Sequence, residues 1–151
     1  MSIYNFEKIL AHQDVSKLNS KGFRKLFHVR IEPTELCNFQ CKFCATQDPE
    51  RLGILRAQGF DGNNRKFDLN RLLNLLDELK NVGVKAISFT ASGEPLMFPV
   101  IQKVIEKAIE LEFDLALTSN FGMPIKDNLI KLLSSFSWLR WSMNGDLKKL
   151  T

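Results

Sequence analysis

The chain has 151 residues, of which 44% are hydrophobic and 25% are charged, and its formal net charge is +4. These values are ordinary for one folded domain with a core, and they exclude a low-complexity chain. The basic residues are scattered, so we expect no nucleic-acid interface, although an anionic substrate fits the charge. No apolar run approaches the roughly 20 residues of a membrane span, and the first residues do not read as a secretory signal.

The first predicted element is an amphipathic helix over residues 3–18, and we assign residues 1–24 to an amino-terminal helical extension. Residues 25–32 form the first predicted strand, which Pro33 ends because proline cannot donate to a sheet ladder. Residues 45–66 form a long irregular connection. Connections of this length are either functional or mobile, so a substrate lid and a simple insertion both stay open.

The remainder of the chain alternates between helices and strands. The predicted elements are a helix after Asp68 that stops at Gly83, a strand over 84–90, a helix over 99–112 with Pro99 in its first turn, a strand over 113–118, a helix from about Asp127, and a strand over 138–142. We expect Leu129, Ile130, Leu132 and Leu133 to point inward from the last helix. This alternation predicts an α/β fold with a mostly parallel sheet.

All three cysteines of the chain lie in the loop that follows the first predicted strand. Cys37, Cys41 and Cys44 have the spacing Cys-x3-Cys-x2-Cys, and Phe43 precedes the last of them. Structural zinc sites usually have four protein ligands, and cubane iron–sulfur clusters normally have four cysteines. A loop with three thiolates therefore predicts a cluster with one iron left open to a ligand that is not protein.

Two other interpretations of the cysteines stay open at this point. A zinc site could be completed by His12 or His28, or the three thiols could be unrelated core residues. An odd number of clustered cysteines fits a reducing cytoplasm better than a disulfide framework.

Polar residues also follow the other three predicted strands. These residues are Gly93, Glu94 and Pro95 after the second strand, Ser119 and Asn120 after the third, and Ser142 and Asn144 after the fourth. Each set alone has the composition of an ordinary turn. Because the carboxyl ends of parallel strands open on the same edge of a sheet, one ligand there could touch all four loops.

The cysteine loop resembles that of the radical S-adenosylmethionine (SAM) superfamily. In that family three cysteines bind a 4Fe–4S cluster, SAM chelates the fourth iron, and an aromatic residue precedes the third cysteine. The resemblance implies that Cys37, Cys41 and Cys44 are the metal ligands and that Phe43 lies near the adenine of SAM.

The later loops are similar to other motifs of the family. Ser92-Gly93-Glu94-Pro95 resembles the Gly-Gly-Glu-Pro motif that meets the SAM amino group, with serine in place of the first glycine. Thr118-Ser119-Asn120-Phe121-Gly122 resembles its Thr-Asn-Gly turn with one extra residue, and Ser142 and Asn144 sit like polar residues that reach the ribose or the carboxylate of SAM. The resemblance therefore implies cofactor contacts at Gly93, Glu94, Pro95, Asn120, Ser142 and Asn144.

The family core is a partial barrel of six βα units, whereas this chain supplies about four. We therefore expect residues 25–151 to form an incomplete core, with the remaining strands in a carboxyl-terminal half. The resemblance implies an enzyme that cleaves SAM to a 5′-deoxyadenosyl radical, with an external flavodoxin- or ferredoxin-type electron donor. The substrate is not identified, although a peptide or a sugar is favoured. The alternatives are an inert truncated fragment and a small zinc-binding interaction module.

Overall fold

The computed structural model describes residues 26–41, 43, 44 and 67–143. Its strands are β1 (His28–Ile31), β2 (Ala86–Phe89), β3 (Asp114–Ser119) and β4 (Trp138–Trp141). The predicted helix over 3–18, the connection over 45–66, His12 and Asn144 lie outside the described residues.

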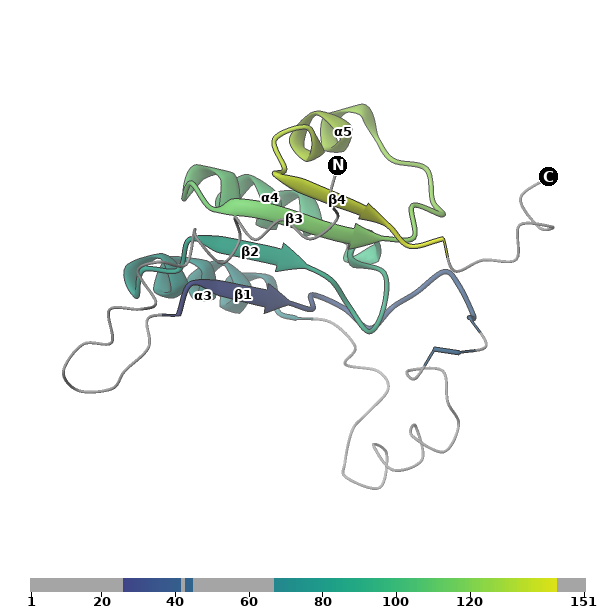
Figure 1. Cartoon of the computed structure of the whole chain (residues 1–151), viewed down its shortest axis with the longest axis horizontal. Coiled ribbons are helices and arrows are strands. Elements are labelled where there is room, and N and C mark those ends of the chain that lie inside the picture. Colours follow the sequence, from purple (N-terminus) through teal and green to yellow (C-terminus); the bar gives the residue numbers. More distant parts are fainter. Residues whose placement is uncertain (1–25, 42, 45–66, 144–151) are drawn as a thin grey trace, which may run out of the picture.

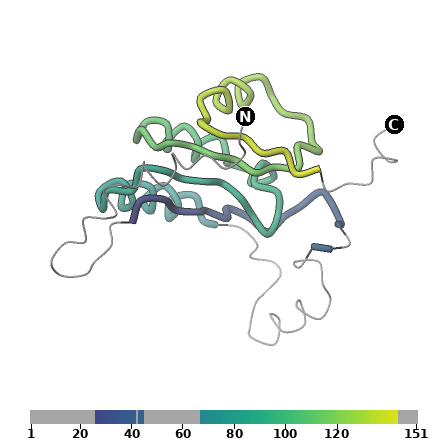
Figure 2. Tube along the Cα trace, in the orientation of Figure 1, coloured from purple at the N-terminus to yellow at the C-terminus, as the bar shows by residue number. Residues whose placement is uncertain are grey.

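The four strands form one parallel sheet in the order β1-β2-β3-β4. One row of the register contains Ile31, Phe89, Leu117 and Leu139. All four arrows point to the same side in Figure 1, and the loops that follow β1 and β2 lie together at that edge in Figure 2. The predicted α/β fold with a parallel sheet is confirmed, and the sheet places the four loops where the sequence analysis expected them.

The three described helices are α3 (Leu69–Asn81), α4 (Ile101–Glu110) and α5 (Asp127–Leu133). The predicted cap of α3 is confirmed, because the side chain of Asp68 accepts a hydrogen bond from the N–H of Arg71. Gly83 follows this helix with a φ of 90°, in the left-handed region that favours glycine. None of the described helices is long and apolar enough to span a bilayer.

The core lies between the sheet and the helices that cover one of its faces. Helices α3 and α4 lie behind the sheet in Figure 1. Alternate residues of β2 and β3 are buried, so these strands turn one set of side chains towards the helices. The large side chains that are fully buried include Leu72, Leu76, Ile87, Phe89, Val104, Ile105, Leu115 and Leu117.

Two expectations about this half of the chain need correction, and one element was not predicted. Ile130 is not inward, because its side chain is 52% exposed. Leu129, Leu132 and Leu133 share one helix face at i, i+3 and i+4 spacing, and Ile130 lies off that stripe. Helix α4 begins at Ile101 rather than around Pro99, and a short 3₁₀ turn, η2 (Pro95–Met97), precedes it without having been predicted.

Candidate cofactor site

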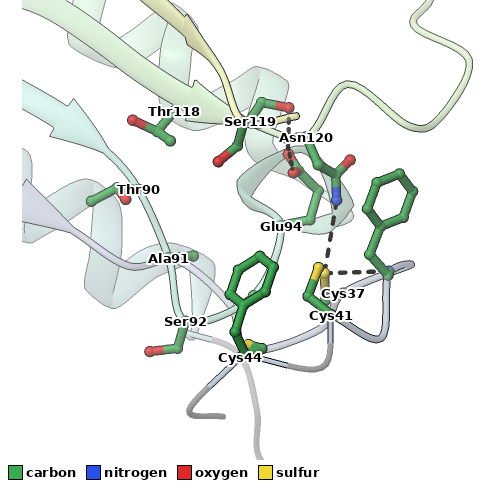
Figure 3. Close-up of a pocket in the computed structure, with 14 residues that line it drawn as sticks. Cys37, Cys41, Cys44, Thr90, Ala91, Ser92, Glu94, Thr118, Ser119 and Asn120 are labelled. Carbon is green, nitrogen blue, oxygen red and sulfur yellow. Dashed lines mark hydrogen bonds between the residues drawn. The ribbon is translucent and has the colours of Figure 1, made fainter. Parts of the chain in front are cut away.

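One pocket lies at the carboxyl edge of the sheet and collects residues from the loops after all four strands (Figure 3). The lining residues are Cys37, Phe39, Cys41, Phe43, Cys44, Thr90, Ala91, Ser92, Gly93, Glu94, Thr118, Ser119, Asn120 and Ser142. The structure therefore brings together the three cysteines and most of the site residues predicted from sequence. Pro95 lies just outside the lining as a buried first residue of η2.

The cysteine loop presents three thiols that form no disulfide, all of them partly buried. A tight turn joins two of them, since the N–H of Cys44 donates to the carbonyl of Cys41 at 2.9 Å. Burial raises the pKa of the Cys41 thiol above its usual range, and the charges of Cys37 and Cys44 raise it further. The neighbouring charges therefore oppose the ionisation of Cys41 unless a cationic centre offsets them.

The described residues form no ready site for a single metal ion. Within the described ranges, no three Cys, His, Asp or Glu side chains converge to hold one ion. Three thiolates are one ligand short of a structural zinc site, and as soft donors they suit an iron–sulfur cluster. His28 does not complete a zinc site: it opens β1, at the strand's other end from the cysteines, with Nε2 2.9 Å from Oγ of Ser88.

The Gly-Glu pair after β2 holds the chain just before the first cysteine. The N–H of Glu94 donates to the carbonyl of Leu36 at 2.7 Å. A Cβ on Gly93 would lie 2.4 Å from the backbone carbonyl carbon of Glu35, so only glycine allows this close approach. This backbone contact sets where the cysteine loop begins.

The carboxylate of Glu94 is almost completely buried, at 2% exposure. Oε1 accepts from the hydroxyl of Ser119 at 2.7 Å and from the N–H of Leu96 at 3.1 Å, and Oε2 accepts from the N–H of Asn120 at 2.7 Å. The bond to Leu96 caps η2, and the other two join the β2 loop to the end of β3. Because buried charges are stable only when they are hydrogen-bonded, this carboxylate is also a structural cross-link.

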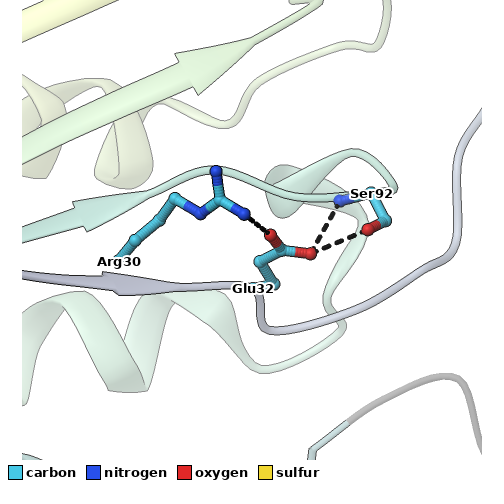
Figure 4. Close-up of polar contacts among 3 residues, drawn as sticks. All are labelled: Arg30, Glu32 and Ser92. Atoms are coloured by element: carbon cyan, nitrogen blue, oxygen red, sulfur yellow. Dashed lines mark hydrogen bonds and ion pairs between the residues drawn. The ribbon is translucent and has the colours of Figure 1, made fainter.

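Ser92, which departs from the glycine of the family motif, has a clear partner. Its N–H and its hydroxyl both donate to Oε2 of Glu32, at 3.1 and 2.8 Å, and Arg30 pairs with the other carboxylate oxygen (Figure 4). Burial alone would raise the pKa of Glu32, but the Ser92 bonds and the charge of Arg30 outweigh it and lower the pKa. Serine here fastens the loop after β2 to the end of β1.

The remaining predicted residues occupy different parts of the rim. Phe43 is 72% exposed while lining the pocket, so its ring is free to contact a bound molecule. Ser142 also lines the pocket, and its N–H donates to the carbonyl of Ser119 at 2.8 Å. Sequence reasoning placed Ser119 at this edge, but it missed Asn38 and Glu32 as parts of this junction. A polar side chain directly after a strand or beside a cysteine was the only available signal for them.

Comparisons with known proteins agree with this geometry. The sequence model of the Radical SAM superfamily matches residues 31–144. A GTP 3′,8-cyclase of Clostridium perfringens is 29% identical over 135 residues, which are 87% of this chain and 38% of that enzyme. The chain therefore spans well under half the length of this curated relative.

Two solved structures share the fold. One is SuiB of Streptococcus suis bound to S-adenosylmethionine, with a TM-score of 0.60 and 19% sequence identity. The match covers 92% of this chain and 31% of the SuiB chain. The other is BtrN in complex with AdoMet and 2-DOIA, with a TM-score of 0.62 and 17% sequence identity. The match covers 82% of this chain and 48% of the BtrN chain. With the family match covering most of the chain and the cysteine motif in place, the protein belongs to the radical SAM superfamily.

Proposed function

We propose that Cys37, Cys41 and Cys44 bind a 4Fe–4S cluster and that SAM binds beside it in the same pocket. Members of this family are enzymes that use both cofactors. The observation that carries the assignment to these residues is the meeting of three thiols with the loops after β2, β3 and β4 in one pocket.

The chemistry comes from the cofactors. Held by Cys37, Cys41 and Cys44, the cluster would supply one electron for the cleavage of SAM into methionine and a 5′-deoxyadenosyl radical, which would take a hydrogen atom from the substrate. The protein residues bind and orient these groups and exclude water.

Glu94 is proposed to receive the SAM ammonium group. A carboxylate offers about four acceptor positions, and three of them are used by chain donors, so one is left for the ligand. Gly93 and Pro95 shape the backbone around it. We propose that Ser142 and Asn144 contact the ribose or the carboxylate of SAM. The exposed ring of Phe43 is proposed to contact the adenine.

Electrons are proposed to come from a separate flavodoxin- or ferredoxin-type protein. All three cysteines of the 151 residues lie in the one loop, so these residues hold no ligands for a second, cysteine-bound cluster. An oxygen-sensitive cluster and free thiols also favour the cytoplasm as the compartment.

The proposed substrate is a peptide or a sugar, because Trp138 to Gly145 resembles the fourth-strand sequence of family members with such substrates. The check is 5′-deoxyadenosine formation with representative peptides and sugars. A substrate of the right class should raise the rate of 5′-deoxyadenosine formation above the rate without substrate. If no peptide and no sugar raises this rate, the proposed substrate class is contradicted.

The cofactor assignment is tested by anaerobic reconstitution with iron and sulfide, followed by metal analysis and electron paramagnetic resonance. We expect about four irons per chain and a reduced-cluster signal that changes when SAM is added. The control is a variant with Cys37→Ala, Cys41→Ala and Cys44→Ala, which should retain no cluster.

Three outcomes would overturn the assignment. They are full iron in the triple variant, about one zinc per chain in the wild type, and a cluster signal that SAM does not change. The first two reject the cluster ligands. The third leaves the cluster in place and rejects the open iron.

A further inference from the structure

Asn120 forms hydrogen bonds with the neighbouring segments of the chain around the site. Its backbone groups form the first two of these bonds. Its N–H donates to Oε2 of Glu94 at 2.7 Å. Its carbonyl accepts from the indole Nε1–H of Trp141 at 2.9 Å. These bonds tie the end of β3 to the loop after β2 on one side and to β4 on the other.

The side chain of Asn120 points from β3 towards the cysteine loop (Figure 3). Its Nδ2 lies 2.9 Å from Oδ1 of Asn38 and 3.8 Å from Sγ of Cys37, and it donates to both. Its Oδ1 accepts from the N–H of Gly122 at 2.7 Å. With the two backbone bonds, every polar group of this residue has a partner, so the direction of the amide is fixed.

The backbone after Asn120 is bent to make this arrangement. Phe121 has a φ of 48°, which is uncommon for a bulky residue and costs conformational free energy. The N–H of Phe121 donates to the hydroxyl of Ser119 at 2.9 Å and offsets part of this cost. This strained residue lies between the asparagine and the glycine of the turn, and it allows Oδ1 of Asn120 to close the turn onto Gly122.

The sulfur of Cys37 consequently has two N–H donors from the chain. The nearer is the backbone N–H of Phe39 at 3.4 Å, and the other is Nδ2 of Asn120. Hydrogen bonds to the ligand sulfurs are one of the factors that set the potential of an iron–sulfur cluster. A donor stabilises the more negative, reduced state more than the oxidised state, so it raises the potential.

We propose that Asn120 is a positioning residue that directs the sulfur of Cys37 and raises the reduction potential of the cluster bound there. This inference rests on the proposed function, because it concerns the same cluster. Asn120 acts through Cys37 and through the fixed direction of its amide. A role in contacting SAM is not needed for it.

The test is a redox titration of the reconstituted cluster in Asn120→Ser. Serine removes the amide donor and keeps an oxygen near the N–H of Gly122. We expect full iron content and a midpoint potential more negative than that of the wild type by clearly more than the error of the titration. A potential equal to that of the wild type would overturn the proposal.

Two controls separate the lost donor from a loosened loop. Asn38→Ala removes its bond to the carbonyl of Gly122 and also the oxygen that accepts from Nδ2 of Asn120, while the N–H of Gly122 still holds Oδ1 of Asn120 and keeps Nδ2 towards Cys37. It should keep the wild-type potential, and an equal shift in this variant would contradict a direct role for Asn120. Asn128→Ala changes an exposed asparagine that bonds Gln102, and it should change neither iron content nor potential.

If Asn120→Ser fails to retain iron, the redox titration is made on Asn120→Ala instead. If both variants lose iron while Asn38→Ala retains it, Asn120 has a structural role, and the proposed effect on the reduction potential is rejected. Iron content of the wild type reports separately on the proposed function. A wild type without a cluster rejects that function, whereas a wild-type cluster with an unshifted Asn120 variant rejects only this inference.

Discussion

The wall of the pocket and strand β4 distribute polar and apolar side chains in opposite ways. Behind the cysteine loop, Glu94 and Ser119 are buried, although both are polar. On β4, Trp138, Leu139 and Trp141 are exposed, although all three are apolar. The buried polar groups are stable because each has hydrogen-bond partners. Strand β4 is the edge strand of the described sheet, and its apolar side chains are exposed there. Burial in the described part of the chain therefore follows position in the sheet, and side-chain type alone does not predict it.

The largest effect is expected when the buried carboxylate is removed. Glu94→Ala leaves the donors of Ser119, Leu96 and Asn120 without a buried acceptor and should lower the free energy of unfolding by about 4 kcal/mol. Urea denaturation measures this. Glu110→Ala, at an exposed ion pair with Lys107, is the matched control and should cost less than about 0.5 kcal/mol. Equal losses would mean that the Glu94 network does not support the fold.

A pair of leucines in the same row of the sheet tests the comparison directly. Leu117 on β3 is 1% exposed, and its register partner Leu139 on β4 is 46% exposed. Leu117→Ala should cost about 3 kcal/mol because it opens a cavity in the core, and Leu139→Ala should cost less than about 1 kcal/mol. Thermal or urea unfolding of the two variants checks the difference. Similar costs would show that another part of the chain covers β4.

Two glycines of the site differ in what surrounds them. A Cβ on Gly93 would meet backbone atoms of Glu35 and Leu36, whereas a Cβ on Gly122 would meet the end of the Phe39 ring, which can move. Gly93→Ala should therefore cost about 2 kcal/mol and reduce iron uptake, and Gly122→Ala should cost less than about 1 kcal/mol. Denaturation and metal analysis together check this. The expectation fails if Gly122→Ala is the more damaging change.

The smallest effect concerns Glu32, and it depends on pH. A carboxylate whose folded pKa is lowered adds stability above its unfolded pKa of about 4.3, and this stability is lost as the pH falls through the lower folded pKa. Because the Glu32 side chain is 33% exposed, we expect Glu32→Gln to cost only about 1 kcal/mol at pH 7. The cost should disappear as the pH falls through the lowered folded pKa. Ser92→Ala in the same background should add little, and a cost independent of pH would contradict the role of the charge.

The local features of this protein were readable from sequence. The cap at Asp68 and the stop at Gly83 depend on neighbouring residues, and the order of strands depends on hydrophobic periodicity, so both were predicted correctly. The cysteine spacing likewise needs no distant contact. The prediction that Ile130 points inward from α5 was wrong, because Ile130 lies off the face that Leu129, Leu132 and Leu133 share.

Contacts across the sheet could not be predicted in the same way. Ser119 bonds Glu94 from 25 positions away, and Asn38 bonds the carbonyl of Gly122 from 84 positions away. Such pairs depend on the register of the strands and on the path of each loop. The sequence placed Glu94 and Asn120 at one edge, but the carboxylate's role as a cross-link and the amide's direction required the folded chain.

The bond between Trp141 and Asn120 gives the protein an optical reporter. Both tryptophans of the chain lie on β4, and the indole of Trp141 is hydrogen-bonded to the residue that contacts Cys37. The indole fluorescence of the protein therefore originates entirely from β4. Iron–sulfur centres absorb in the near ultraviolet and quench nearby indoles, so the emission of β4 follows how much of the neighbouring site is filled, without an added dye.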